Sequence, residues 1–142
     1  MEKRGKAGII FPVIIIVLGV VLAAGSRLWF SACGVQEDGS YMACHWAEVT
    51  VSFLGIVLAV QGVTALFIKE RKAQGAVFAA AVPVALLSCF IPGTIISICA
   101  MSAMYCRSAL RPATIAIGAV ITVVALLGAI YGLKGTKKDE DE

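Results

Sequence analysis

The sequence predicts an all-α integral membrane protein, a four-transmembrane-helix bundle with two cysteine-bearing extracytoplasmic segments. The chain of 142 residues is 60% hydrophobic and 15% charged, with a mean hydropathy of +0.94. Soluble domains are about half apolar and about a quarter charged, so this apolar excess indicates helices in lipid. Uncharged runs long enough to cross a bilayer recur along the chain. Residues 1–142 are therefore predicted to form a single membrane domain.

The first two helices are predicted over residues 7–26 and 49–68, because each range holds 20 uncharged residues. At about 1.5 Å rise per residue, such a run spans the hydrocarbon core. A basic head before an apolar run also fits a cleaved signal peptide, but this run is long for one and similar segments follow it. Gln61, inside the second run, is expected to hydrogen-bond to another helix.

The third helix is harder to delimit, because 34 uncharged residues separate Lys72 from Arg107 and no single helix needs so many to cross a bilayer. Pro83 lies inside the first part of this run, and Pro92-Gly93 is a strong break in the second. The third helix is therefore predicted over residues 76–90, with a kink at Pro83 as one option.

Two outer segments and a tail complete the predicted plan. The first outer segment covers residues 27–48, and the second covers residues 91–111 and either re-enters the membrane or lies along its interface. A fourth helix is predicted over residues 112–133, where Pro112 suits the first turn. Residues 134–142 are polar and are predicted to be a disordered tail.

The distribution of Lys and Arg predicts the orientation in the membrane, because cytoplasmic loops carry an excess of both. Nine of them lie on the side of the termini, and three lie on the other side. The sequence therefore predicts a multi-pass protein of the cell (inner) membrane with both termini in the cytoplasm. The nine are Lys3, Arg4, Lys6, Lys69, Arg71, Lys72, Lys134, Lys137 and Lys138, and the three are Arg27, Arg107 and Arg111.

On this topology Cys33, Cys44, Cys99 and Cys106 all belong to the outer segments. Paired thiols oxidise in an extracytoplasmic compartment, so disulfides that fasten these segments are expected. The local pairs Cys33–Cys44 and Cys99–Cys106 are the simplest pattern. Four cysteines permit three connectivities, so pairing between the two segments stays open.

Soft-metal binding is an alternative use of the same segments, although no cofactor is the leading expectation. Thioether and thiolate donors suit copper(I), and Cys with His also suits zinc. Against this, Met is an ordinary filler of apolar segments, and the sequence has one histidine and no C-x-x-C. The candidate ligands are Met42, Cys44, His45, Cys99, Met101, Met104 and Cys106.

Thiol-disulfide redox chemistry is a third use of the cysteines. Reactive pairs usually show C-x-x-C, which is absent here. His45 beside Cys44, or Arg107 beside Cys106, would have to lower a thiol pKa instead. Catalysis is therefore not the expected role.

Charged and aromatic residues at the helix ends are expected to anchor the chain at the membrane interface. Two of the arginines, Arg107 and Arg111, are also expected to pair with Glu48 or Asp38. The predicted anchors are Arg27, Trp29, Trp46, Arg107 and Arg111.

Two cysteine patches carry a family resemblance. The first is Gly39-Ser40-Tyr41-Met42-Ala43-Cys44-His45-Trp46, and the second is Ile98-Cys99-Ala100-Met101-Ser102-Ala103-Met104-Tyr105-Cys106-Arg107, followed by Pro112. Together with the helix number and chain length, they resemble a prokaryotic membrane family, domain of unknown function 4418. The resemblance implies a four-helix inner-membrane protein of unknown activity, and more loosely an association with a transporter of the ATP-binding-cassette class.

The function expected from the sequence is a non-enzymatic accessory or scaffold subunit of a larger membrane complex. Its expected partners are the lipid bilayer and either a second copy of the chain or an ATP-binding-cassette transporter. The net charge of +3 needs no nucleic-acid partner. Small residues at Gly19 with Ala23, and at Gly128 with Gly132, are candidate surfaces for such contacts. The alternative is an extracytoplasmic copper, zinc or thiol-redox protein.

Overall fold

The computed structural model describes residues 6–29, 37–40, 43–95 and 106–140, except for the side chains of 106–107 and 135–140. Within these ranges it has four long helices and no strand: α1 (Ala7–Leu28), α2 (Ala43–Phe67), α3 (Arg71–Phe90) and α4 (Arg111–Glu140). Two short segments lie between α3 and α4: η1 (Ile91–Ile95), whose backbone is non-helical at Pro92 and Gly93, and the π-helical turn η2 (Cys106–Leu110). All four spans are long and apolar enough to cross a membrane, which confirms the all-α, four-helix membrane fold.

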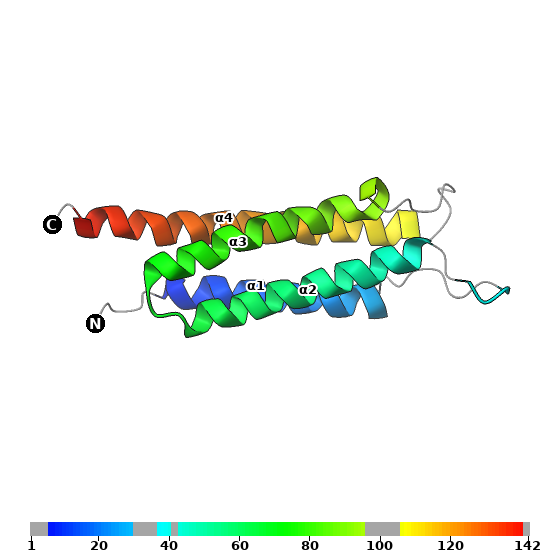
Figure 1. The fold of residues 1–142 in the computed structure, drawn as a ribbon, viewed down its shortest axis with the longest axis horizontal. Helices are drawn as coiled ribbons and strands as arrows, with labels where there is room; N and C mark the ends of the chain where they lie inside the picture. The colour runs from blue at the N-terminus through cyan, green and yellow to red at the C-terminus, as the bar shows by residue number, and fades with distance from the viewer. Residues whose placement is uncertain (1–5, 30–36, 41–42, 96–105, 141–142) are drawn as a thin grey trace.

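The helices run side by side in one elongated bundle (Figure 1). The start of α1, the end of α4 and the short link between α2 and α3 lie at one end, which we call the terminal end. The end of α1 and the start of α2 lie at the opposite end, which we call the loop end. This arrangement agrees with the prediction that both termini share one side of the membrane.

Two helical hairpins, α1 with α2 and α3 with α4, make the most extensive contacts in the bundle. In the first hairpin the backbones touch, because a Cβ atom on Gly19 would lie 2.8 Å from the Ala59 nitrogen. A Cβ atom on Gly55 would likewise lie 2.7 Å from the Ala23 nitrogen. Small residues therefore set the spacing of these helices, as they do in many membrane bundles.

The second hairpin uses glycine in the same way. A Cβ atom on Gly132 would lie 2.7 Å from the Gly75 Cα atom, and one on Gly128 would collide with the ring of Phe78. The prediction that Gly19 and the Gly128/Gly132 face serve a partner is therefore wrong, because the other helix of the same hairpin already contacts these glycines. Ala23, the other residue of the first pair, is only half-buried, so this part of the α1 face stays accessible.

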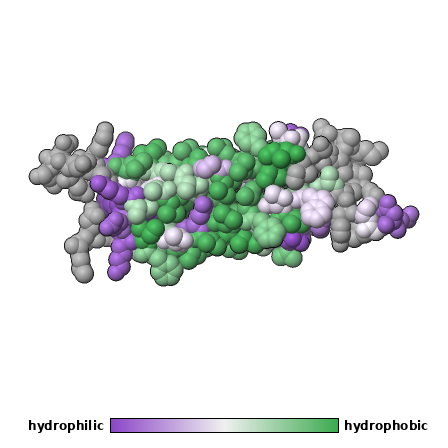
Figure 2. Space-filling model, in the orientation of Figure 1, coloured by the Kyte–Doolittle hydropathy of each residue, from purple (hydrophilic) through white to green (hydrophobic). Residues whose placement is uncertain are grey.

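The bundle buries a limited set of side chains, and many large apolar side chains point outward. The core consists mainly of alanine and aliphatic residues, with Phe78 the largest side chain, whereas residues such as Val17, Phe53 and Leu127 are exposed. Figure 2 shows the result as a broad apolar belt with hydrophilic side chains beside it at the terminal end. Such a belt suits burial in lipid, where apolar surface has no cost.

Several helix bounds differ from the prediction. α2 begins at Ala43 rather than at residue 49, so part of the predicted outer segment 27–48 is helical. α3 begins at Arg71 rather than at residue 76, directly after Glu70 in extended conformation. Charged and polar residues concealed both starts, because a hydropathy window ends at polar residues while a helix needs only compatible backbone angles.

The predicted break at Pro92-Gly93 is confirmed. Pro92 has ψ 109° and Gly93 has φ +92°, so the helical path ends there after Ile91. Residues 96–105 of the predicted outer segment 91–111 lie outside the described residues. The prediction that residues 134–142 are disordered is wrong as far as Glu140, to which α4 continues. Lysines near a helix C-terminus interact favourably with the helix dipole, and residues 134–142 contain no proline that would end the helix.

Candidate functional site

An ion pair joins α1 and α2 at the loop end of the bundle. The Arg27 Nε atom lies 3.7 Å from the Glu48 Oε1 atom, and the Glu48 residue is only 5% exposed. A buried carboxylate needs such a partner because charge is costly to remove from water. Arg27 is thus a partner of Glu48 that the sequence did not predict; the predicted pairing with Arg107 stays a prediction, because the Arg107 side chain lies outside the described residues.

Glu48 belongs to a polar row on the inner face of α2. Cys44, Glu48 and Ser52 are spaced by four residues, and all three are buried. The Ser52 hydroxyl donates to the Ala23 carbonyl of α1 at 3.2 Å, and the Ser26 hydroxyl donates to the same oxygen at 3.0 Å. In the loop-end half of the first hairpin, α1 and α2 are therefore held together by polar contacts as well as by close packing at glycine.

The Cys-His-Trp triplet forms the first turn of α2 and spreads over different sides of it. Cys44 is fully buried, His45 is partly buried, and Trp46 is 59% exposed. Neighbouring helix positions do not face each other, so Cys44 and His45 do not converge on one point. His45 packs instead against Trp46, with ring centroids 6.0 Å apart in an edge-to-face arrangement.

The candidate metal ligands are not brought together within the described residues. No group of three or more His, Cys, Asp or Glu side chains suited to a metal ion occurs there. Most of the proposed ligands lie outside that part of the chain, so the copper or zinc alternative stays a prediction. Those ligands are Met42, Cys99, Met101 and Met104, together with the side chain of Cys106.

No two cysteines of the described part lie within disulfide distance. Cys33 and Cys99 are outside it, so each of the predicted local pairs has a member that cannot be placed. The remaining cysteine, Cys89, belongs to the contact between α3 and α4. Its Sγ atom lies 3.8 Å from the Ile115 carbonyl and fills the space beside Gly118.

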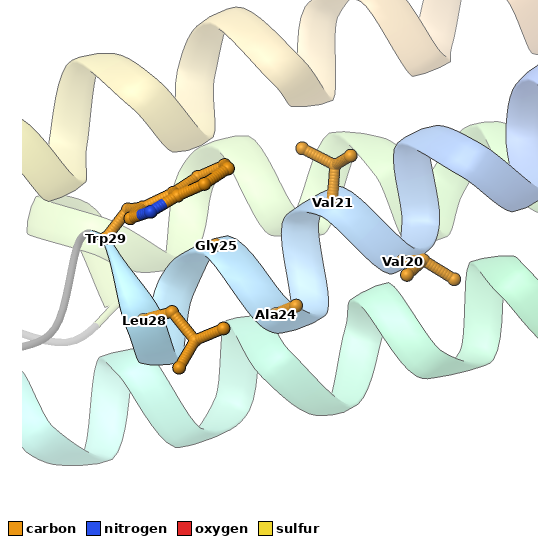
Figure 3. A pocket seen from close by; sticks show the side chains of 6 residues that line it. All are labelled: Val20, Val21, Ala24, Gly25, Leu28 and Trp29. Carbon is orange, nitrogen blue, oxygen red and sulfur yellow. The ribbon is translucent and has the colours of Figure 1, made fainter.

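The predicted interface anchors occupy the loop end. Trp29 is 69% exposed at the end of α1, and Figure 3 shows its side chain beside a small apolar pocket of about 140 Å³ on that helix. Arg111 is half-buried at the start of α4. Exposed Trp29 and Trp46 at the same end as Arg27 suit a membrane–water interface, where tryptophan is enriched.

A tight turn lies in the first outer segment, where the Glu37-Asp38-Gly39-Ser40 run predicted one. The Ser40 hydroxyl donates to the Asp38 carboxylate at 2.9 Å, and Gly39 supplies the positive φ of 82°. This hydrogen bond lowers the pKa of Asp38, because it stabilises the charged carboxylate.

At the terminal end, the Gln74 side chain of α3 hydrogen-bonds to both α1 and α2. The sequence did not predict this role, because the third helix was expected to begin at residue 76. Gln74 is 6% exposed, and its Nε2 atom donates to the Gly8 carbonyl of α1 at 2.8 Å and to the Ala65 carbonyl of α2 at 3.0 Å. Pro12 explains the first acceptor, because proline has no N–H to give to the carbonyl four residues earlier. A proline within a predicted membrane helix was the available signal.

Gln61 of α2 behaves differently from the expectation. Its Oε1 atom is buried and has no hydrogen-bond partner among the described residues, so the predicted bond to another helix is missing at this atom. Beside this part of α2, an apolar groove of about 500 Å³ opens between α1 and α2. The groove is lined by Ile16, Val20, Ala23, Ala24, Ile56, Ala59, Val60, Val63 and Thr64.

Comparisons with known proteins place the chain in a family without assigning it an activity. No curated protein and no solved structure matches the sequence. The family model described as Domain of unknown function (DUF4418) matches residues 15–131, which include α2, α3 and most of α1 and α4. Because the match covers most of the 142 residues and reaches into all four membrane helices, the chain belongs to this family.

Proposed function

We propose that the protein is a non-enzymatic accessory or scaffold subunit that binds a transmembrane helix of a partner in the groove between α1 and α2. The groove is the observation that carries this proposal. It lies on the outside of the first hairpin, and its lining is almost wholly aliphatic. The role concerns packing within the membrane and assigns no chemical step to the chain.

The composition of the groove supports a helix as its occupant. Three of its lining residues, Ala23, Ala24 and Ala59, have small side chains, and the lining also includes the exposed Val20 and Val60. Lipid tails are as apolar as leucine, so helices in a membrane associate through close packing rather than through the hydrophobic effect. Small side chains let a partner backbone approach closely, and the Thr64 hydroxyl already donates to the Val60 carbonyl of its own helix.

The proposed partner is a membrane complex, with an ATP-binding-cassette transporter and a second copy of the chain as the two candidates. The transporter rests on family resemblance alone. We further propose the cell (inner) membrane with both termini in the cytoplasm, because the described cations concentrate at the terminal end. A cytoplasm-only reporter fused to the C-terminus is expected to be active, and a silent fusion would reverse the orientation.

Photo-crosslinking in native membranes tests the groove directly. A photoreactive residue placed at Val60 is expected to give one discrete cross-linked product, to be identified by mass spectrometry. The same residue at Val123 is the matched control, because this valine is similarly exposed, at 55% against 58%, but lies on α4 outside the groove. Equal labelling at both positions, or lipid adducts only, would contradict a docked helix.

We also propose that disulfides fasten the outer segments. Cys44 stands at the loop end, and Cys33 lies only a few residues after the end of α1 in the sequence. Thiols are counted by intact mass after alkylation, with and without prior reduction. A single reactive thiol, at Cys89, is the expected result. Three or more free thiols in protein from an oxidising compartment would contradict bridging and direct attention to copper, zinc or thiol redox chemistry.

A further inference from the structure

The terminal end of the bundle carries a patch of positive charge, in which the described cations outnumber the described carboxylates. We call it the basic patch, and among the described side chains it contains a single carboxylate neighbour, Glu70. No described cation of the patch lies within ion-pair distance of a described carboxylate. Figure 2 shows this hydrophilic region directly beside the apolar belt. The basic patch consists of Lys6, Lys69, Arg71, Lys72 and Lys134.

Arg71 is the most fixed member of the basic patch. Its guanidinium carbon lies 5.4 Å from the ring centroid of Tyr131, and that ring packs against Phe11 at 6.1 Å. The residues come from α3, α4 and α1, so three helices meet at this point. Contact with an aromatic face orients a guanidinium and leaves its N–H edge available for an anion. Lys134 follows Tyr131 by three positions and lies on the same side of α4.

The positions of two of these cations, Lys6 and Arg71, are not explained by helix stability. Lys6 and Arg71 stand at the start of α1 and α3, where the helix dipole disfavours positive charge, and neither first turn contains an acidic residue. The hydrogen bond from Gln74 to the Gly8 carbonyl holds these two first turns next to each other. Among the described side chains, only Glu70 offers these cations a counter-charge, and an external anion would balance the others.

The surface next to the patch indicates what kind of anion fits. Ile9 and Ile10 of α1 and Ile130 and Leu133 of α4 are exposed one or two turns from the cations. A ligand that contacts both surfaces must join a negative head to an apolar tail. We propose that the basic patch binds the phosphate headgroup of an anionic phospholipid, with Arg71 and Lys134 as its main contacts and the acyl chains against the apolar belt.

Native mass spectrometry of the purified full-length chain tests the proposal. The protein is exchanged into detergent with phosphatidylglycerol, with phosphatidylcholine, or with inorganic phosphate alone. Retention of phosphatidylglycerol is expected to exceed that of phosphatidylcholine, and Arg71→Gln is expected to reduce it about fivefold, the typical effect of one basic residue near an anionic bilayer. Arg111→Gln is the matched control, because Arg111 is also a half-buried arginine at a helix start but lies at the loop end.

A second variant, Lys134→Gln, changes an exposed side chain and so reports on binding even if the Arg71 variant fails to fold. It is expected to reduce phosphatidylglycerol retention as well. The proposal is overturned if both variants retain as much phosphatidylglycerol as the unmodified protein, or if phosphatidylcholine is retained equally. It is also overturned if inorganic phosphate alone binds as tightly, because the acyl chains would then have no part in recognition.

Discussion

The Gln74 side chain donates to the Gly8 carbonyl in place of the backbone N–H that Pro12 lacks. A double-mutant cycle tests this interpretation. Gln74→Leu removes the side-chain N–H donor and puts an apolar side chain of similar size in its place. Pro12→Ala restores a backbone N–H that can bond to Gly8 within α1. If our interpretation is correct, the two changes must interact, because both determine whether the same buried carbonyl has a donor.

The size of the effect follows from the geometry. The Gln74 Nε2 atom makes two buried bonds, at 2.8 and 3.0 Å, so its loss leaves buried carbonyls on α1 and α2 without this donor. An unsatisfied buried polar group costs about 1–3 kcal/mol, while side-chain bonds between membrane helices average about 0.6 kcal/mol. We therefore expect Gln74→Leu to lower the free energy of unfolding by about 1–3 kcal/mol. In the Pro12→Ala background the loss should shrink by about 0.5–1.5 kcal/mol, because Gly8 regains a donor.

Unfolding in mixed micelles, followed by the fluorescence of Trp29 and Trp46, provides the four free energies of the cycle. Gln61→Leu is the control, because it removes a glutamine whose Oε1 atom has no partner among the described residues. That variant is expected to be neutral or stabilising. An equal cost of Gln74→Leu in both backgrounds would refute the role given to Pro12. A large loss of unfolding free energy in Gln61→Leu would show that removing a glutamine from these helices is destabilising whether or not it makes hydrogen bonds.

Three further predictions concern the loop-end half of the bundle. Gly55→Val places side-chain atoms where backbone lies 2.7 Å away, so it should lower the free energy of unfolding by about 1–3 kcal/mol or more; an unchanged unfolding midpoint would contradict this contact. Arg27→Gln leaves the buried Glu48 carboxylate without this cation, so it should destabilise more than the Arg27→Gln/Glu48→Gln double variant in the same unfolding assay, and the reverse order would rule out the pairing. Because hydrogen bonds from Ser40 lower the pKa of Asp38, the turn should persist at and above the ordinary Asp pKa and loosen only as the pH falls through the lowered value. NMR titration should show a higher midpoint for Asp38 in Ser40→Ala, and an unchanged midpoint would exclude that bond.

Hydropathy predicted the helices well because the bilayer imposes a length and a composition on every span. The run over residues 7–26 became α1 with a difference of only two residues at its end. The same reasoning placed the starts of α2 and α3 too late, at residues 49 and 76. Both missed segments contain polar side chains, such as Glu48 and Gln74, that are buried by contacts with another helix. Those contacts are tertiary, and no window on a single segment reports them.

The polar site was only partly predictable for a similar reason. The sequence identified Arg27 and Glu48 as residues of one outer segment, but it did not predict that they pair with each other. The register between α1 and α2 decides the pairing, and that register depends on the glycine contacts at Gly19 and Gly55. The sequence showed that Gly19 permits close approach. It did not show whether the approaching helix belongs to the same chain.

The distribution of contacts indicates which end of the bundle depends on the outer segments. At the terminal end, Gln74 and the contacts of Phe11 with Phe78 and Tyr131 join the two hairpins. At the loop end, the ion pair described here lies within the first hairpin only. A disulfide within the first outer segment would therefore stiffen a connection that the ion pair already supports. A disulfide between the two segments would add a covalent link between the hairpins at the end opposite Gln74, so the connectivity determines whether the two hairpins are joined at both ends of the bundle.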